Sequence, residues 1–215
     1  MVHFTLFGIP VYIRPSFWVV LAIFGGALSI SSVEDLIYPA LFVIAGFVAI
    51  LSHEMGHALV GRKLGGGQQT IVLELFGGLT SSHGMQLTRG GRALMILAGP
   101  MMTLLLGIIS LGLTWNIVAP VMTSYNLNFW DLAISPFTAA LISPKLYILS
   151  CLIMIGEWWT ILNLLPIYPL DGGQLIAQYI RSPRKVFMTG FITAILIGLL
   201  SFQLLSLIHI SEPTR

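Results

Sequence analysis

The chain has 215 residues, of which 56% are apolar and 8% are charged, and its formal net charge is +2 at pH 7. A soluble domain carries roughly 25% charged residues, so this composition leaves too little polar surface to coat a water-soluble globule and predicts an integral membrane protein. The small net charge gives no support for a nucleic-acid partner.

The amino-terminal segment is predicted to hold a short pair of strands. Residues 3–13 carry β-branched and aromatic side chains around Gly8-Ile-Pro10, a pattern typical of strands joined by a turn. Residues 1–15 lack the charged start and apolar core of a cleavable signal peptide, so none is expected.

Five stretches are apolar and long enough to cross a bilayer as helices, because about 20 apolar residues span its core. They cover residues 15–33, 36–61, 93–118, 146–165 and 186–210. Their length, and the lack of a ten-residue alternating pattern, favour helices over the strands of a barrel. The sequence therefore predicts an all-α membrane protein with a small strand element.

The second stretch carries three ionisable residues, His53, Glu54 and His57, after a long uncharged run. Ionisable side chains in a bilayer are costly and usually functional. The H-E-x-x-H spacing puts both imidazoles on one face of a helix, with a carboxylate beside them. This pattern predicts a zinc site with Glu54 as the base; the alternative is a satisfied polar cluster between helices.

Residues 65–87 are predicted to form a strand followed by a glycine turn. A glycine cluster precedes residues 70–76, and Gly77-Gly78 follows them. If the strand over 70–76 has an open edge, a substrate unwound from its helix could pair with it. Residues 119–144 are polar and aromatic, and are predicted to be an extramembrane loop or an interfacial segment.

A hydrolytic zinc site needs a third protein ligand, and Asp171 is the best candidate. It follows the fourth apolar stretch, where Pro166, Pro169 and the pair Gly172-Gly173 are expected to break the helix and allow unusual dihedrals. Irregular backbone at membrane depth is tolerated where it is buried in protein or lines a wet cavity, and hydrolysis requires water. A turn or helix-cap aspartate is the alternative.

Two other polar residues of the fourth stretch have open roles. Asn163 lies eight residues before Asp171, and its amide is a candidate to stabilise an oxyanion or to hold the substrate backbone. An interhelical hydrogen bond is the alternative for Asn163. Glu157 is expected at membrane depth, where it could be protonated, pair with a partner or line a water path.

The basic residues predict the orientation in the membrane. Arg62 and Lys63 follow the second stretch and Arg184 precedes the fifth, whereas acidic residues follow the first. By the positive-inside rule, the amino terminus and the loops around Lys63 and Arg184 face the cytoplasm. His53 lies ten residues from Lys63, which is about 15 Å along a helix and well inside a core about 30 Å thick.

Together, these motifs resemble the site-2 protease family of intramembrane zinc metalloproteases. The similarity runs from about residue 4 to residue 185, through residues 6–11, 14–16, the H-E-x-x-H helix at 53–57, F-G-G at 76–78, L-A-G-P at 97–100, N-L-L-P at 163–166 and P-L-D-G-G at 169–173. Family members often have a sixth span, so about five to six transmembrane helices are expected.

The resemblance implies a zinc ion held by His53, His57 and Asp171, with Glu54 as the base. It implies a three-helix catalytic core, formed by the second, third and fourth stretches. The implied activity is hydrolysis of transmembrane or membrane-anchored substrates within the lipid bilayer of the cell, in regulated proteolysis or in the removal of signal-peptide remnants. A non-catalytic member that binds membrane proteins is the alternative; a transporter ranks last, because only one broken helix is found.

The chain is predicted to form a single polytopic protease domain over residues 1–215, with its core at about 36–185. We find no inserted peptide-binding domain and no nucleotide-sensing tail, which leaves room for a separate adaptor or inhibitor protein. Residues 206–215 resemble a translated sequencing adaptor and are predicted to be a non-native tail.

Overall fold

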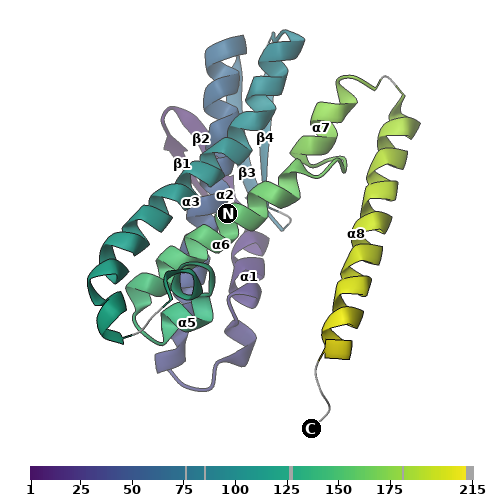
Figure 1. Ribbon diagram of the computed structural model, residues 1–215. Helices are drawn as coiled ribbons and strands as arrows, with labels where there is room; N and C mark the ends of the chain where they lie inside the picture. The colour runs from purple at the N-terminus through teal and green to yellow at the C-terminus, as the bar shows by residue number, and fades with distance from the viewer. Residues whose placement is uncertain (76, 85, 126–127, 181, 212–215) are drawn as a thin grey trace. The chain divides into compact units, whose positions relative to one another are not determined.

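The computed structural model describes residues 1–75, 77–84, 86–125, 128–180 and 182–211 (Figure 1). The chain divides into two compact units, Met1–Ile161 and Leu162–Arg215. Phe76 of the predicted F-G-G motif, Arg181 and the last four residues of the predicted tail lie outside the described residues.

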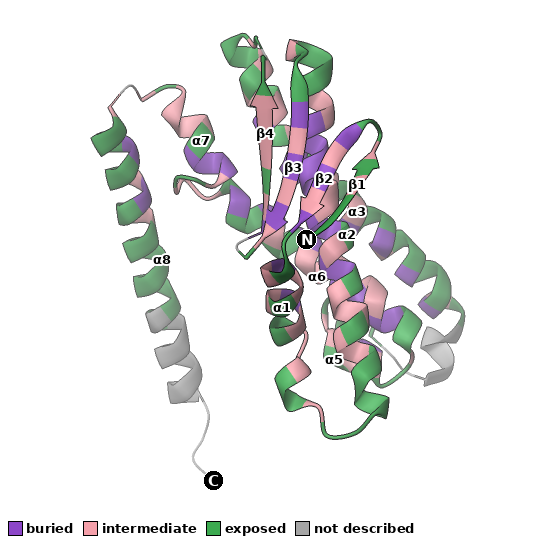
Figure 2. Cartoon of the chain, turned by 180° about the vertical axis from the view of Figure 1, so that it is seen from behind, coloured by how far each residue is buried: buried purple, intermediate pink, exposed green. Residues whose placement is uncertain are grey.

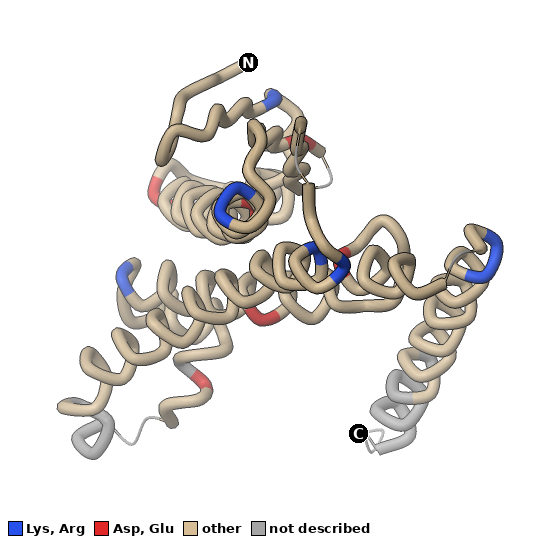
Figure 3. Tube along the Cα trace, turned by 90° about the horizontal axis from the view of Figure 1, so that it is seen from above, with Lys and Arg blue, Asp and Glu red and all other residues tan. Residues whose placement is uncertain are grey.

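Four described helices are long and apolar enough to cross a membrane, which confirms the predicted class of a mainly helical membrane protein. They are α2 (Ile37–Gly65), α3 (Arg89–Tyr125), α6 (Pro144–Leu164) and α8 (Pro183–Ser211). Figure 3 shows how few Lys, Arg, Asp and Glu residues these helices carry between their ends. Uncharged side chains along a helix are what a hydrocarbon environment requires.

The prediction of a spanning helix over residues 15–33 is wrong. Helix α1 covers only Pro15–Phe24, and ten residues rise about 15 Å, half of the hydrocarbon core. The helix stops at Gly25, and Gly26 takes a left-handed φ of 85°, which costs glycine little. Two 3-10 turns, η1 (Ala27–Ser29) and η2 (Glu34–Leu36), then lead into α2.

A four-stranded sheet belongs to the first unit, and both predicted strand regions are confirmed. It is built from β1 (Val2–Leu6), β2 (Ile9–Ile13), β3 (Gln68–Glu74) and β4 (Gly77–His83), in the order β1-β2-β3-β4. The two hairpins are antiparallel, and they join through parallel pairing of β2 with β3, with Val11 opposite Ile71.

This strand order corrects the expectation of an open edge at residues 70–76. Strand β3 lies between β2 and β4, so both of its edges are already paired. The pairing with β2 was not foreseen, because it joins segments about 60 residues apart. The described edge strands of the sheet are β1 and β4. The prediction of a turn at Gly77-Gly78 is wrong, because both glycines begin β4, where they pair with Glu74 and Leu73.

The buried face of the sheet packs on α1 and α2. Side chains alternate between the two faces of a strand, and the buried apolar residues of β2 and β3 are Ile9, Val11, Ile13, Ile71 and Leu73. These residues share one apolar cluster with Phe17, Ile50 and Met55 of the helices. Figure 2 shows the buried residues gathered where β2, β3 and α2 meet. The sheet is therefore anchored beside the middle of α2.

Helices α2 and α3 approach each other closely because small residues line their contact. A Cβ atom built on Gly56 of α2 would lie 2.3 Å from the carbonyl oxygen of Ala98 on α3. Helix α6 joins the same group: the hydroxyl groups of Thr160 and Thr103 lie 2.8 Å apart. Helices α2, α3 and the first-unit part of α6 thus pack together, as the predicted helical core requires.

The segment after α3 is more helical than predicted. Helix α3 continues to Tyr125, and two short helices follow it, α4 (Phe129–Ile134) and α5 (Pro136–Ala140). The side chain of Asn128 accepts a hydrogen bond from the backbone N–H of Trp130 and caps α4. Ser135 caps α5 in the same way.

The second unit holds the end of α6, a turn over residues 165–170, the short helix α7 (Asp171–Ala177) and α8. The predicted break after the fourth apolar stretch is confirmed, because α6 ends at Leu164, before Pro166. Gly190 of α8 lies against the turn, where an added Cβ would be 3.3 Å from the Cα atom of Ile167.

Candidate metal centre

His53, Glu54 and His57 lie in the interior of helix α2, all within the first unit. Their exposed fractions are 2%, 5% and 8%. Because the helix is continuous across them, the spacing of four residues places both imidazoles on one face. Three buried ionisable side chains on an otherwise apolar helix need compensating partners, and their contacts identify these.

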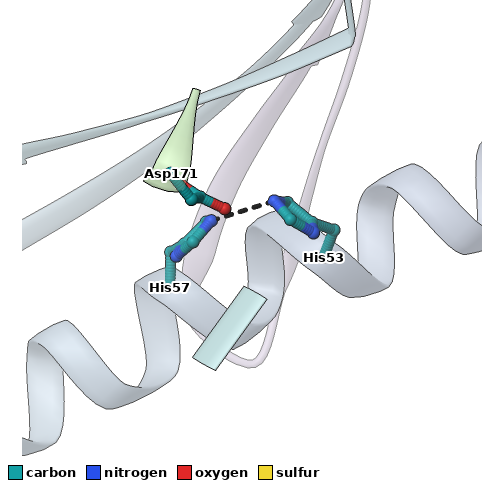
Figure 4. A group of neighbouring side chains, drawn as sticks. All are labelled: His53, His57 and Asp171. Atoms are coloured by element: carbon teal, nitrogen blue, oxygen red, sulfur yellow. Dashed lines mark hydrogen bonds between the residues drawn. The ribbon is translucent and has the colours of Figure 1, made fainter. Parts of the chain in front are cut away.

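The two imidazoles face each other. Their Nε2 atoms lie 3.1 Å apart, and the two rings meet edge to face with centroids 4.7 Å apart. Figure 4 shows the two ring nitrogens pointing toward one another from neighbouring turns of the helix. Both side chains therefore aim the same type of donor atom at one small region.

The backbone of α3 orients His57. Its Nδ1 atom lies 2.8 Å from the carbonyl oxygen of Met95, and a carbonyl oxygen only accepts. Nδ1 therefore carries the proton in this contact, and the Nε2 lone pair of the neutral ring is left for a metal ion. A hydrogen bond that fixes the distal ring nitrogen is the usual support of a metal-ligating histidine.

Gly99 of α3 leaves space beside the paired nitrogens. A Cβ atom at this position would lie 2.2 Å from Nε2 of His57 and 2.9 Å from Nε2 of His53. No methyl group fits there, so any larger residue would enter the region that both imidazoles face. The L-A-G-P motif thus contributes a cradle for the two histidines.

These residues fit a zinc ion. Neutral imidazole nitrogens are common zinc ligands at about 2.0–2.1 Å, and one ion at that distance from each nitrogen spans their 3.1 Å separation. The donor set, the oriented ring of His57 and the glycine cradle agree with the zinc ion that the sequence predicts.

Strand β4 contacts Glu54. The hydroxyl of Thr80 donates to Oε2 of Glu54 over 2.7 Å. A Cβ atom on Gly78 would lie only 2.2 Å from Cγ of the same glutamate, so the strand passes directly over this side chain. Beside it, Trp159 of α6 packs on Gly77, and its ring centroid lies 6.5 Å from that of His53.

Asp171 is the first residue of α7, in the second unit, and its side chain is 5% exposed. Asp171 is not the N-cap residue of α7, because Leu170 is the N-cap. No side-chain hydrogen bond caps this helix. The two glycines after it do not adopt unusual dihedrals as predicted, since neither has a positive φ. They serve close packing: a Cβ on Gly172 would lie 2.1 Å from the carbonyl oxygen of Leu164.

The remaining polar candidates differ in burial. Asn163 is buried in the last turn of α6, within the second unit. Glu157 of α6 is exposed, so it does not belong to the buried group around His53.

Sequence reasoning missed Thr80 and the roles of Gly99 and the Met95 carbonyl. A Gly-Pro pair inside an apolar helix is an unusual combination that could have pointed to Gly99.

The family model of peptidase family M50 matches residues 41–207, which include the histidine pair, Glu54 and the segment around Asp171. The chain belongs to this family. The solved structure of a site-2 protease from Methanocaldococcus jannaschii has the same fold: the TM-score is 0.60 at 25% identity, over 96% of this chain and 86% of that one. The resemblance to the site-2 proteases is thereby confirmed.

Curated relatives carry zinc metalloprotease names. One from Methanocaldococcus jannaschii is 28% identical over 213 residues, covering 94% of this chain and 55% of the relative. A Synechocystis protein with a provisional name of the same kind is 28% identical over 188 residues, covering 82% of this chain and 43% of that protein. The M50 chain described here thus spans about half the length of the curated relatives it matches.

Proposed function

We propose that this M50 chain is an intramembrane zinc metalloprotease that hydrolyses peptide bonds of transmembrane or membrane-anchored proteins. The observation that carries the proposal is the buried H-E-x-x-H turn of α2. Its two imidazole nitrogens lie 3.1 Å apart beside a glycine cradle, on a helix of membrane-spanning length. Family membership and the zinc metalloprotease names of the relatives support it.

The proposed ligands of the zinc ion are His53, His57 and Asp171, the three side chains drawn in Figure 4. Each offers one ligand atom, a ring nitrogen or a carboxylate oxygen. Two histidines and one carboxylate are a usual set for a catalytic zinc ion, which keeps one position open. When bound, zinc polarises a carbonyl group and lowers the pKa of a coordinated water toward about 7.

Glu54 is the proposed general base. It neighbours His53 in the sequence, is buried, and is held by Thr80 through one of its two carboxylate oxygens. It would take the proton of the attacking water and pass it to the leaving amine. Asn163 is proposed to donate its amide N–H to the developing oxyanion or to the substrate backbone.

The edge of β4 is the proposed place for an unwound substrate. A helical peptide hides its amides in its own hydrogen bonds, so it must be extended before it can be cut. An edge strand pairs with extended peptides through its free backbone groups, and β4 lies at the edge of the sheet with Thr80 and Gly78 against Glu54. A peptide on this edge would lie near the base.

The proposed setting is the cell membrane, with the amino terminus on the cytoplasmic side. The four apolar helices support a multi-pass protein, and the basic residues Arg62 and Lys63 close the last turn of α2. A separate adaptor or inhibitor protein is proposed to control access, and the substrate is a transmembrane protein.

The test is cleavage of a transmembrane substrate by purified protein in liposomes. We expect Glu54→Gln to keep its zinc and lower the cleavage rate at least about 100-fold, because general base catalysis contributes roughly that much or more. The matched control is Glu34→Gln, which changes an exposed glutamate before α2 and should cleave like the unchanged protein.

Equal cleavage by Glu54→Gln and the unchanged protein would reject the assigned base. A folded sample that cleaves its substrate after the zinc has been removed by dialysis against a chelator would reject the metalloprotease assignment. A protein that binds zinc and the substrate without any turnover would instead favour the non-catalytic alternative.

A further inference from the structure

We propose that Thr80 is a positioning residue for Glu54, so that strand β4 orients the base as well as offering an edge to the substrate. The inference rests on the proposed function. The observation that carries it is a contact between residues 26 positions apart, made by a side chain that no sequence motif singles out.

The hydrogen bond is directional. The hydroxyl oxygen of Thr80 lies 2.7 Å from Oε2 of Glu54 and 3.2 Å from the backbone carbonyl oxygen of the same residue. A hydroxyl has one proton to donate, and the carboxyl oxygen lies at the shorter distance. Thr80 therefore binds one carboxylate oxygen and leaves Oε1 to exchange a proton.

Close packing adds to this bond. The Cβ atom that Gly78 lacks would lie 2.2 Å from Cγ and 2.5 Å from both Cδ and Oε1 of Glu54. The strand at Gly78 thus lies against the outer part of the glutamate side chain, from Cγ to Oε1. With the hydroxyl at one end and the strand along its side, the carboxylate has few other orientations within the buried site.

The strand itself is well anchored. Thr80 pairs with Ile71 of β3, a fully buried residue of the central strand pair. Ile71 belongs to the apolar cluster that joins the sheet to α2. The position of the Thr80 hydroxyl is therefore set by the packing of the sheet on the helix that carries Glu54.

Orientation matters because proton transfer requires the base within hydrogen-bond reach of the proton it takes. A glutamate side chain has several rotatable bonds, and fixing one oxygen lowers the number of unproductive orientations. Removing the hydroxyl should slow turnover without removing the base, the zinc ligands or the edge of β4.

The experiment compares Thr80→Val, Thr80→Ala and Thr80→Ser in the liposome assay, with zinc content measured for each. We expect the valine and alanine variants to lose about 10-fold in kcat, with KM and bound zinc unchanged. The serine variant keeps a hydroxyl and should cleave almost like the unchanged protein. The matched control is Thr70→Val, on the neighbouring strand, which should leave kcat unchanged.

A second readout separates positioning from general damage. Because Thr80 acts through Glu54, adding Thr80→Val to Glu54→Gln should cause little further loss. Full kcat in both the valine and alanine variants would overturn the inference, and so would a loss of zinc, a rise in KM alone, or no recovery with serine. If Thr80→Val does not fold, the kcat, KM and zinc content of Thr80→Ala test the inference. An active Glu54→Gln protein would instead reject the proposed function.

Discussion

Two pairs of adjacent glycines, Gly77-Gly78 and Gly172-Gly173, look alike in the sequence but meet different neighbours. Side chains added to the first pair would meet two other side chains: the ring of Trp159 and the side chain of Glu54. Side chains added to the second pair would meet backbone atoms of residues 164–168. The first pair makes room for Trp159 and for the candidate base Glu54, and the second lets the chain turn tightly before Asp171.

This difference shows that the effect of adding a side chain at a glycine depends on whether the glycine faces side chains or backbone. A displaced side chain can rotate away, so the steric effect of a substitution there should fall on that side chain more than on folding. A backbone carbonyl cannot move without its helix or turn, so a substitution there should damage folding. Four substitutions test this division, from the largest expected effect to the smallest.

Gly172→Ala should have the largest effect. The added Cβ would lie 2.1 Å from the carbonyl oxygen of Leu164, and the turn must open to accept it. We expect roughly 3 kcal/mol or more of destabilisation, measured as a lower midpoint of thermal unfolding in detergent. The control is Gly198→Ala of α8, where no atom of the described residues would lie within 4 Å of the added Cβ. Equal midpoints for both variants would contradict the tight turn.

Gly99→Ala should abolish stable zinc binding while the helices stay folded. Its methyl group would lie 2.2 Å from Nε2 of His57, in the space that both imidazoles face. We expect at least about 100-fold weaker zinc binding. Loss of a residue that only supports a metal ligand usually lowers the affinity by about 10- to 100-fold. Metal analysis after dialysis against buffered zinc measures it. Gly112→Ala, on the same helix with open space, should bind zinc normally.

Gly78→Ala should leave zinc binding intact and slow catalysis. The added methyl group meets Cγ of Glu54, so the carboxylate must leave the orientation that it has beside Thr80. We expect about 100-fold lower kcat, the lower end of what a general base contributes. Single-turnover cleavage and zinc content are measured together on one sample. Zinc loss in this variant would show that β4 supports the metal ligands and not the base.

Gly77→Ala should have the smallest effect. Its φ of 117° disfavours any side chain, and the added methyl group would meet the outer ring atoms of Trp159. We expect about 1–2 kcal/mol of destabilisation from the backbone and less than a 10-fold change in cleavage rate, since Glu54 is not touched. A denaturation series in detergent measures the first and the liposome assay the second. A loss of activity as large as that of Gly78→Ala would remove the distinction between the two neighbouring glycines.

The sequence alone determined what depends on neighbours along the chain. The four-residue spacing of His53 and His57 put both rings on one helix face, Pro166 followed the end of α6, and four of the five predicted apolar stretches form long helices. These features follow from helix geometry and from the chemistry of proline, which are local. The assignment of Asp171 and Asn163 to the site came from the chemistry of these residues near a predicted helix break and from motif resemblance, and it stays a prediction.

Only the tertiary structure decided the features that join distant segments. It paired β2 with β3 and made β4 the edge strand, it ended α1 after ten residues, and it brought Thr80 to Glu54 and Gly99 to the histidines. Apolar runs and glycines are compatible with many different packing arrangements of helices and strands. Which contacts form is set by packing between elements, because steric fit and hydrogen bonding act between residues that the sequence keeps far apart.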